Sequence, residues 1–411
     1  MKRVAVIGAG AAGLMAAYRA AVNGAEVWLL EKNEKAGKKI YITGKGRCNV
    51  TNDSSPEGFL ENVVHNRKFL IGAIHAFSSA DLMRFLEEGG VPLKVERGSR
   101  VFPASDKASD ITRCLENCCR RAGVALCYNE EVRSVWKNED GSFCVQTASR
   151  EFSADAVIVC TGGISYPSTG STGDGYRIAE RFGLALVPRR AALCGIECAF
   201  LPEDDLQGLS LKNVRLTAFA QGKIVGGFFG EMLFTHFGIS GPIALSLSSG
   251  INDMDLRELR LELDLKPALD DDSLDRRILR DFEGEKNKSL GNVLRLLLPQ
   301  RLIASVLARS GIRFQTPVNS VTKEQRRTLL RVLKHFDLKP TALRPVSEAI
   351  VTAGGVDVRE IDPKTMECKK IRGLYFAGEV LDVDALTGGY NLQTAFSTGY
   401  AAGNASGREF A

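Results

Sequence analysis

Three glycines close to the N-terminus stand at a spacing that suits a phosphate ligand. Gly8, Gly10 and Gly13 form the pattern Gly-x-Gly-x-x-Gly, with Ala11 and Ala12 inside it. An apolar strand is expected directly before the pattern and a helix directly after it. In that setting Gly8 permits a tight turn, Gly10 lets the backbone approach a pyrophosphate, and Gly13 lets the helix pack on the strand. Because the helix dipole also favours phosphate at this point, the pattern predicts a bound dinucleotide.

An acidic residue at the end of the next strand narrows the choice of dinucleotide. Residues 26–31 are expected to form a second apolar strand that ends in Glu31, 18 residues beyond Gly13. A carboxylate at this place accepts hydrogen bonds from the adenosine ribose and repels a 2′-phosphate. Glu31, with the neighbouring Lys32, therefore favours FAD or NAD over NADP.

The segment that follows separates FAD from NAD. Residues 37–52 are dense in glycine, cations and small polar groups, and no Walker A register fits them. A loop of this kind, directly after the ribose-binding acid, can supply backbone N–H groups and positive charge to a flavin pyrophosphate and ring. The sequence therefore predicts FAD. The candidate FAD-binding residues of this loop are Lys38, Lys39, Gly44, Gly46, Arg47, Cys48 and Asn49.

Two later strands end in turns of small residues that we expect to meet the same ligand. Residues 156–163 and 373–379 each read as an apolar strand followed by such a turn, and a helix is expected from about residue 394 to 402. In a flavin fold, Glu379 or its backbone would bind ribitol or pyrophosphate, and the helix N-terminus would point at the flavin ring. The candidate residues here are Thr161, Gly162, Gly163, Gly378, Glu379, Gly389, Asn391, Leu392 and Gln393.

These motifs together resemble the glutathione-reductase-type flavoproteins and, more narrowly, the BaiN/RdsA flavoprotein family. The narrower resemblance rests on residues 44–49, 233–242 and 388–391, and it extends over essentially the whole chain. It implies a three-domain FAD protein of the bacterial cytoplasm. Members of the family are described as a bile-acid ring reductase, a ribosomal-RNA dihydrouridine synthase and an aminoacetone oxidase. From similar flavin folds we also expect the backbone at Val132 to touch adenine.

Four side chains are candidates for acid–base chemistry beside the flavin. Cys48 follows Arg47, and a cation with loop amides would lower the thiol pKa and make Cys48 the acid that protonates a carbon after hydride transfer. Tyr41 and Tyr390 can donate a hydrogen bond to a substrate carbonyl, and His236 lies within a family motif. Each also has a structural interpretation: a thiol packed against flavin, two aromatic walls and a hydrogen-bonded structural histidine.

The elements that would position these residues predict an α/β fold with insertions. Residues 1–187 and 346–411 are expected to form a Rossmann-like FAD-binding domain from both ends of the chain. Strand alternation at 188–265 predicts an inserted β-barrel-like domain, to which part of 310–345 can contribute. Charged helical patterns at 266–345 predict a helical cap domain. Because no second dinucleotide fingerprint with a ribose acid occurs, NADH or NADPH would bind transiently or not at all.

Composition excludes several classes of protein. The chain has 411 residues, 44% of them apolar, and no apolar run approaches the ~18 residues of a membrane span. Ten cysteines without a C-x-x-C pair indicate reduced thiols in a cytoplasm, and with only four histidines they predict neither a metal site nor a disulfide-reductase mechanism. The net charge of +5 is mild and permits either a small anionic ligand or RNA. No pattern specifies an oligomeric state.

The expected activity is that of an FAD-dependent oxidoreductase in which NADH or NADPH drives reduction of a C=C bond conjugated to a carbonyl. A 3-oxo bile-acid or steroid ring is the favoured substrate, because the mild charge and the scarcity of aromatic residues, with two Trp and eight Tyr, do not suit an RNA platform. The alternatives are reduction of uridine C5=C6 in ribosomal RNA, amine oxidation of the aminoacetone type, and a non-catalytic flavin-binding role.

Overall fold

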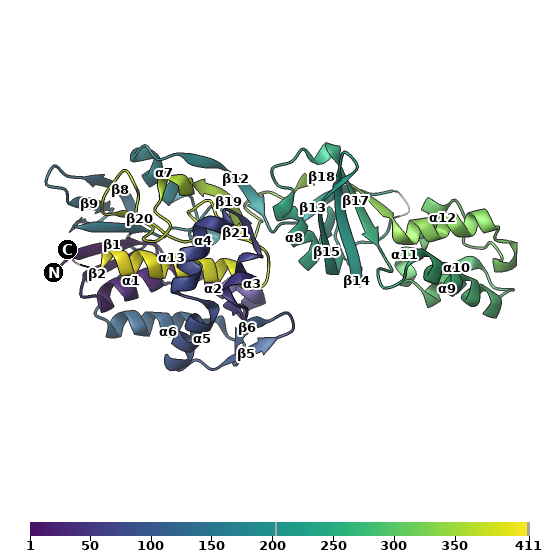
Figure 1. Cartoon of the computed structure of the whole chain (residues 1–411), viewed down its shortest axis with the longest axis horizontal. Coiled ribbons are helices and arrows are strands. Elements are labelled where there is room, and N and C mark those ends of the chain that lie inside the picture. Colours follow the sequence, from purple (N-terminus) through teal and green to yellow (C-terminus); the bar gives the residue numbers. More distant parts are fainter. Residues whose placement is uncertain (202–203, 409–411) are drawn as a thin grey trace. The chain divides into compact units, whose positions relative to one another are not determined.

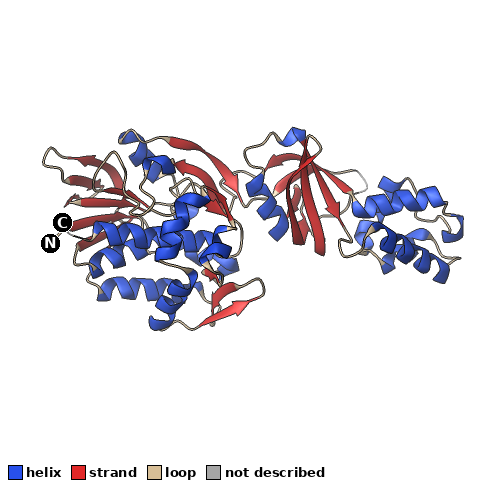
Figure 2. Ribbon diagram, in the orientation of Figure 1, coloured by secondary structure: helices blue, strands red, loops and turns tan. Residues whose placement is uncertain are grey.

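The two ends of the chain fold together, and the middle forms a separate unit. The computed structural model describes residues 1–201 and 204–408. Unit 1 contains Met1–Ala192 with Val346–Ala411, and unit 2 contains Leu193–Pro345. In Figure 1 the purple and yellow ends of the chain lie in unit 1, and Figure 2 shows that both units mix helices and strands.

A five-stranded parallel sheet forms the centre of unit 1. Its strand order is β20-β11-β1-β2-β7, and every neighbouring pair is parallel. β1, β11 and β20 are buried along nearly their whole length, as expected for parallel strands covered on both faces. The order brings a strand from the C-terminal part of the chain beside strands from the N-terminal part. The bounds are β1 Arg3–Ile7, β2 Glu26–Glu31, β7 Ala125–Tyr128, β11 Ala156–Val159 and β20 Leu374–Phe376.

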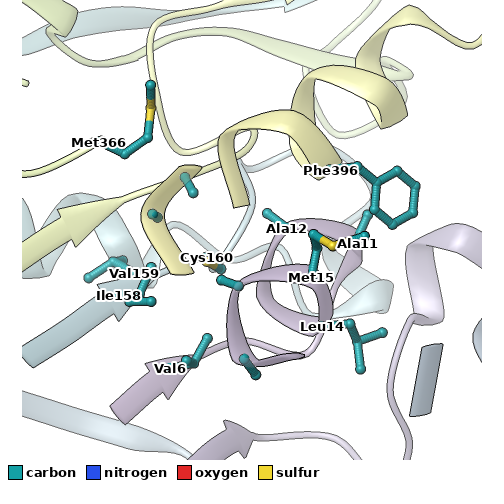
Figure 3. Packing of buried hydrophobic residues seen from close by; sticks show 14 of the residues in the cluster. Val6, Ala11, Ala12, Leu14, Met15, Ile158, Val159, Cys160, Met366 and Phe396 are labelled. Carbon is teal, nitrogen blue, oxygen red and sulfur yellow. The ribbon is translucent and has the colours of Figure 1, made fainter. Parts of the chain in front are cut away.

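Two helices, α1 (Ala11–Val22) and α13 (Tyr390–Ser406), pack together so closely that their backbones nearly touch. A Cβ atom added at Gly403 would lie 2.2 Å from the carbonyl oxygen of Ala16, which is impossible for a real side chain. The same holds one turn earlier and just past the end of α13, in the pairs Gly399–Ala12 and Gly407–Ala20. Figure 3 shows the small residues of α1 beside α13 in the core of unit 1.

Both helices begin earlier than the sequence pattern predicts. α1 begins at Ala11 instead of residue 14, and α13 begins at Tyr390 instead of about residue 394. In each case a glycine, Gly10 or Gly389, precedes the first turn. The residues of these first turns lack an apolar period, so periodicity alone does not reveal them as helical.

Smaller sheets and helices surround the central sheet of unit 1. The smaller sheets are β8-β9-β10, β3-β6-β5, β12-β19 and β4-β21. Their strands are β3 Thr51–Asn52, β4 Val63–His65, β5 Leu93–Glu96, β6 Arg100–Pro103, β8 Val132–Lys137, β9 Phe143–Thr147, β10 Glu151–Ala154, β12 Leu186–Ala192, β19 Val351–Val356 and β21 Asp384–Ala385. The other helices are α2 Lys38–Ile42, α3 Pro56–Leu60, α4 Arg67–Ala76, α5 Ser79–Glu88, α6 Ala108–Arg121 and α7 Asp174–Arg181.

Within the described residues, the stretch Arg67–Glu88 is the one whose length and composition would let a helix cross a membrane. The stretch is divided into α4 and α5 at Ser78, whose side chain caps α5 by accepting a hydrogen bond from a backbone N–H. The apolar faces of both helices are buried in the core of unit 1. Burial of this kind is typical of core helices.

A closed barrel and a group of helices form unit 2. The barrel has the strand order β13-β16-β15-β14-β17-β18. Because β18 follows the helices in sequence, the chain leaves the barrel after β17 and returns to complete it. The barrel and the helices share one hydrophobic core. The bounds are β13 Ile196–Ala199, β14 Ser210–Ala220, β15 Lys223–Phe234, β16 Gly238–Ser240, β17 Leu259–Asp264, β18 Phe336–Leu343, α8 Pro242–Gly250, α9 Asp271–Gly284, α10 Leu290–Val293, α11 Gln300–Ser310 and α12 Lys323–Lys334.

The boundaries of the inserted part differ in two places from the sequence-based expectation. Residues 188–192 belong to β12, which pairs with β19 inside unit 1 instead of opening the inserted β domain. Residues 336–343 form β18 of the barrel, in line with the expectation that part of 310–345 can contribute to the β domain, so the helical region ends before the expected residue 345. Alternation of residue types shows that a segment is a strand, whereas its partner strand decides which domain it joins.

The contact between α1 and α13 predicts that Gly403→Ala destabilises the fold by about 1–3 kcal/mol, the usual cost of overpacking. The added methyl group would meet the Ala16 carbonyl oxygen, and this clash outweighs the better helix propensity of alanine. Gly250→Ala is the matched control, because no atom lies within 4 Å of a Cβ at this helical glycine. Urea unfolding of both variants checks the prediction, and equal stability of the two would contradict it.

Candidate functional site

A pocket lies where the parallel strands of unit 1 end and the following loops and helices begin. We call it the sheet-edge pocket. Its walls come from the β1–α1 turn, the segment after β2, the turns after β11 and β20, and the first turn of α13. The sequence-predicted residues that line it are Gly8, Gly10, Ala11, Ala12, Glu31, Lys32, Lys38, Lys39, Val132, Thr161, Gly162, Gly378, Glu379, Asn391 and Leu392.

The glycines of the N-terminal fingerprint have three different surroundings. Gly8 has a φ of +96°, and a Cβ there would lie 2.6 Å from the carbonyl oxygen of Cys160. A Cβ at Gly13 would lie 1.8 Å from the carbonyl oxygen of Gly8, so Gly13 is required for the helix to pack on the turn. Gly10 has no atom within 4 Å of its Cβ position and lines the pocket. The open space at Gly10 is therefore available to a ligand.

Two helix N-termini face the sheet-edge pocket. Residues of the first turns of α1 and α13 line it, and the first backbone N–H groups of a helix have no partner within the helix. Thr394 lines the pocket in the first turn of α13, and its hydroxyl is buried without a hydrogen-bond partner among the described residues. These donors and the helix dipoles favour a ligand with phosphate or carbonyl oxygens.

The carboxylate of Glu31 is held in place at one part of the pocket. Its Oε2 accepts a hydrogen bond from the Ala9 N–H at 2.9 Å, and its Oε1 accepts hydrogen bonds from the backbone and side-chain N–H groups of Asn33 at 2.9 and 2.6 Å. The residue is buried, at 8% exposed. A fixed, buried carboxylate that lines the pocket suits the hydroxyl groups of a ribose.

A second carboxylate, Glu379, belongs to a hydrogen-bonded network at another wall of the pocket. The Lys39 ammonium donates to both Glu379 oxygens, at 2.9 and 2.7 Å, and to the Ser165 hydroxyl at 2.6 Å. Glu379 also accepts hydrogen bonds from the Ser165 hydroxyl at 2.9 Å and the Thr352 N–H at 2.8 Å. Ser165 and Thr352 are members of this network that sequence reasoning missed, because neither belongs to a recognised motif.

The other cations of the pocket are paired with carboxylates. Lys32 donates to Asp174 at 2.7 Å and to the Thr172 hydroxyl at 2.5 Å. Lys38 lies 2.8 Å from Glu34. Because the cations are neutralised locally, the pocket does not present a strongly positive surface, and backbone N–H groups remain its main donors to phosphate.

The residues present fit FAD. An open space at Gly10 admits a pyrophosphate, two helix N-termini supply donors, and two anchored carboxylates, Glu31 and Glu379, suit hydroxyl groups. Val132 also lines the pocket, and its contact with adenine stays a prediction. Glu31, the first turn of α1, Lys39, Glu379 and the first turn of α13 would hold the cofactor.

The loop after α2 does not meet the pocket as predicted. Gly44, Gly46, Arg47, Cys48 and Asn49 are not among its lining residues, whereas Thr43 of the same segment is. Arg47 instead stacks on Phe102, 4.2 Å from its ring centroid, and pairs with Glu96 at 2.7 Å and Asp106 at 3.2 Å. The loop is therefore drawn toward the β5–β6 hairpin by charge and aromatic contacts. The side-chain oxygen of Asn49 is buried with no hydrogen-bond partner among the described residues.

The expected lowering of the Cys48 thiol pKa is not found. The Cys48 side chain is fully buried, and burial raises its pKa to about 12, against a weaker opposing effect of its hydrogen bond with Thr43. The Arg47 guanidinium, which was expected to lower the thiol pKa, is engaged by Glu96 and Asp106. Cys48 is thus a neutral thiol packed in the core.

The remaining catalytic candidates occupy three different settings. Tyr41 is half-buried and stacks under the Lys35 ammonium, 4.6 Å from the ring centroid. Tyr390 is buried at the start of α13 and packs edge-on against Phe59. His236 is exposed in unit 2, between β15 and β16. None of the three lines the sheet-edge pocket, and their catalytic roles stay predictions.

Three other predicted residues hold the loops of the pocket wall in place. A Cβ at Gly163 would lie 2.3 Å from the Thr352 hydroxyl, and a Cβ at Gly389 would lie 2.3 Å from the backbone of Thr51. Gln393 is fully buried, and its side-chain oxygen accepts a hydrogen bond from the Thr51 hydroxyl at 2.7 Å. These residues fix the loops that form the walls and do not themselves line the pocket.

A buried charged cluster next to the pocket had no sequence signal. His65 on β4 lies 2.5 Å from Asp384 on β21 through Nδ1 and Oδ1, and the second Asp384 oxygen is buried without a partner among the described residues. The hydrogen bond to Asp384 raises the pKa of His65, against the lowering effect of burial. Burial also raises the pKa of the neighbouring Asp382. Val383, between the two carboxylates, lines the pocket.

Comparisons with known proteins match nearly the whole chain. Residues 2–405 match the family described as the HI0933-like protein Rossmann domain. The chain is 33% identical over 404 residues to a ribosomal RNA dihydrouridine synthase of Haemophilus influenzae, and the match covers 96% of each chain. It is 31% identical over 412 residues to a 3-dehydro-bile acid delta(4,6)-reductase of Clostridium scindens, which covers 99% of each. A flavocytochrome c3 fumarate reductase shares the fold at a TM-score of 0.53 and 16% identity, over 99% of this chain and 78% of that chain.

The open space at Gly10 predicts that Gly10→Val leaves the apoprotein folded and weakens FAD binding at least tenfold. The backbone at Gly10 is in the extended region, so valine is tolerated there, but its side chain would occupy the space needed by the pyrophosphate. Gly250→Val, at an equally open glycine of unit 2, is the control and should bind FAD normally. Visible flavin absorption after reconstitution and the thermal transition of the apoprotein test this. Full flavin loading of Gly10→Val would refute the assignment.

The pair of His65 and Asp384 predicts a pH-dependent contribution to stability. Because the pKa of folded His65 is raised, its stabilising effect is complete below its ordinary pKa of about 6.5 and is lost as pH rises through the raised value. The groups that act on it are Asp384, Asp382 and Arg190. His65→Gln should therefore be less stable than the natural protein at acid pH, and the difference should shrink toward alkaline pH.

Urea unfolding at a series of pH values measures this difference. His75→Gln is the control, because His75 is exposed and lies 3.8 Å from an exposed Glu57. A stability difference for His65→Gln that does not change with pH would show that the charge pair does not contribute.

Proposed function

The chain belongs to the HI0933-like family of FAD-dependent oxidoreductases, and from this premise we propose that it reduces a C=C bond conjugated to a carbonyl, with the uracil ring of RNA as the substrate. When bound and reduced, FAD supplies the hydride for such a bond. The activities named for the two relatives fit one chemistry, because a bile-acid enone and a uracil C5=C6 bond both lie in conjugation with a ring carbonyl. NADH or NADPH is proposed as the transient electron donor.

The chain's own residues have two tasks in this proposal. The first is to hold FAD, through the anchored carboxylates of Glu31 and Glu379, the Lys39 ammonium, and the first turns of α1 and α13. The second is to supply a hydrogen bond to the substrate carbonyl and a proton to the carbon next to it. Tyr41, Tyr390 and His236 are the proposed candidates for the second task. Cys48 is not proposed for it, because its thiol is fully buried and does not line the sheet-edge pocket.

One observation favours RNA over a steroid or bile-acid ring. Residues 286–334, which we call the basic segment, hold 11 lysines and arginines and one acidic residue, Glu324. The segment therefore carries +10, and the remainder of a chain whose total is +5 carries −5. The preference for a steroid ring rested on the mild total charge, which averages these opposite contributions, and on the scarcity of aromatic residues beside basic ones. A strongly basic segment suits a polyanionic substrate, whereas a single steroid ring offers no comparable negative charge.

Single-turnover oxidation of the reduced protein tests the proposal. The flavin is first bleached with NADH or NADPH under anaerobic conditions and then mixed with unmodified ribosomal RNA or with a 3-oxo-Δ4 steroid. Reoxidation by RNA, with a gain of two hydrogens on uridine seen by mass spectrometry, is the expected result. Faster reoxidation by the steroid would transfer the function to a small ring substrate. A flavin that neither NADH nor NADPH bleaches, or that only an amine reduces, would overturn the reductase assignment.

A further inference from the structure

Five of the eleven cations of the basic segment have a structural explanation. Each forms an ion pair with a carboxylate that lies outside the segment. The pairs are Lys288–Glu285 at 2.8 Å, Arg301–Asp205 at 3.1 Å, Arg309–Asp204 at 2.6 Å, Arg326–Asp275 at 2.7 Å and Lys334–Asp264 at 2.7 Å. The Arg309–Asp204 pair is almost completely buried, and the pair of Arg326 and Asp275 joins α12 to α9. These cations help to hold unit 2 together.

The other six cations have no such explanation. All of them are exposed, and within residues 1–201 and 204–408 the structure gives none of them an ion pair. They are Lys286, Arg295, Arg313, Lys323, Arg327 and Arg331.

Three of the six form a stripe along α12. Lys323, Arg327 and Arg331 are spaced four residues apart, on the side opposite the buried Leu329 and Leu333. Like charges at this spacing repel each other and destabilise an isolated helix. The helix dipole favours Arg331 in the last turn but not Lys323 in the first turn, so folding does not account for the whole stripe, whereas a ligand that neutralises it would.

The chain path brings further cations toward the N-terminus of α12, where Lys323 begins the stripe, whereas Arg331 lies in the last turn of that helix. Backbone hydrogen bonds join residues 288–291 to residues 314–318, with lengths of 2.8 to 3.1 Å. Lys286 and Arg313 thus flank two neighbouring segments, and the second of these leads through residues 318–320 into the N-terminus of α12. Figure 1 shows α9, α10 and α12 gathered in this part of unit 2. We call Lys286, Arg313, Lys323, Arg327 and Arg331 together the basic tip.

The chemistry of the basic tip suits phosphodiester groups better than a lipid surface. Three of its five members are arginines, whose planar guanidinium binds phosphate oxygens in pairs. A helix that binds membranes carries large apolar side chains beside its cations. Within the basic segment, the one exposed large apolar side chain of the described residues is Leu296, which is not on α12.

We propose that the basic tip docks the phosphate backbone of an RNA. Contacts of this kind position a nucleic acid without reading its sequence, so the tip would add affinity for any RNA. This inference rests on the proposed function, which makes RNA the substrate. RNA binding can nevertheless be measured without turnover.

A charge-reversal variant tests the docking surface in the full-length, FAD-loaded protein. In K323E/R327E/R331E the stripe on α12 becomes acidic. The dissociation constant for a labelled uridine-containing RNA should rise about tenfold or more, and the slope of log affinity against log salt should fall by about two, because three phosphate contacts are lost. The neutral variant K323Q/R327Q/R331Q should fall between this variant and the natural protein. Flavin content and the thermal transition show whether each variant is folded.

The matched control is K68E/K107E/K364E, which changes net charge by the same amount at exposed lysines of unit 1. Its affinity for RNA should change less than twofold. An equal loss in the control would show that only total charge matters and would overturn the docking surface. Unchanged RNA binding by the folded α12 variant would also overturn the docking surface. Binding to phosphatidylserine vesicles is measured in parallel, and a variant that loses vesicle binding but keeps RNA binding would show that the stripe binds a membrane instead.

The two proposals fail in different ways. If the natural protein binds RNA through the basic tip but RNA never reoxidises the flavin, the proposed reductase activity falls and the docking surface stands. If RNA is reduced and the α12 variant keeps the same KM and dissociation constant, the activity stands and the docking surface falls.

Discussion

The close approach of backbones at glycine positions is the constraint on which unit 1 depends. α1 and α13 come from opposite ends of the chain, and they can pack only because Gly399, Gly403 and Gly407 leave room for the carbonyl oxygens of the facing helix. Gly13 serves the same purpose inside the first turn of α1. Because both helices start at the sheet-edge pocket, this contact also brings two helix N-termini to one pocket. The shape of the pocket is thus a consequence of backbone packing.

Charges in unit 1 and unit 2 are used in different ways. The cations that line the sheet-edge pocket, such as Lys32 and Lys39, are matched by Asp174 and Glu379 and serve to fix its walls. The cations on the outer face of α12 in unit 2 have no such partners among the described residues. Local neutralisation suits a site that binds one neutral flavin ring with two phosphates, whereas unmatched charge suits a polyanion. The mild total charge of the chain conceals this division.

Contacts between distant residues explain where sequence reasoning succeeded and where it did not. The fingerprint of Gly8, Gly10 and Gly13 was predictable because its partners are adjacent strands and a helix. The loop around Arg47 was misplaced because Glu96, 49 residues later in the chain, draws the guanidinium away from the pocket. The pair of His65 and Asp384, 319 residues apart, carries no local pattern at all. The expectation of a low thiol pKa for Cys48 is not met, because burial raises this pKa and burial cannot be inferred from the neighbouring residues in sequence.

The sequence by itself determined the dinucleotide fingerprint, the family and the parallel strands of unit 1, because these depend on local spacing and apolar periodicity. It also contained the basic segment, whose composition is visible in the printed chain. Only the tertiary structure decided which of those cations are matched by carboxylates, where the inserted part begins and ends, and which loop residues line the pocket. These outcomes depend on strand pairing, burial and ion pairs between residues far apart in the chain, which no local pattern encodes.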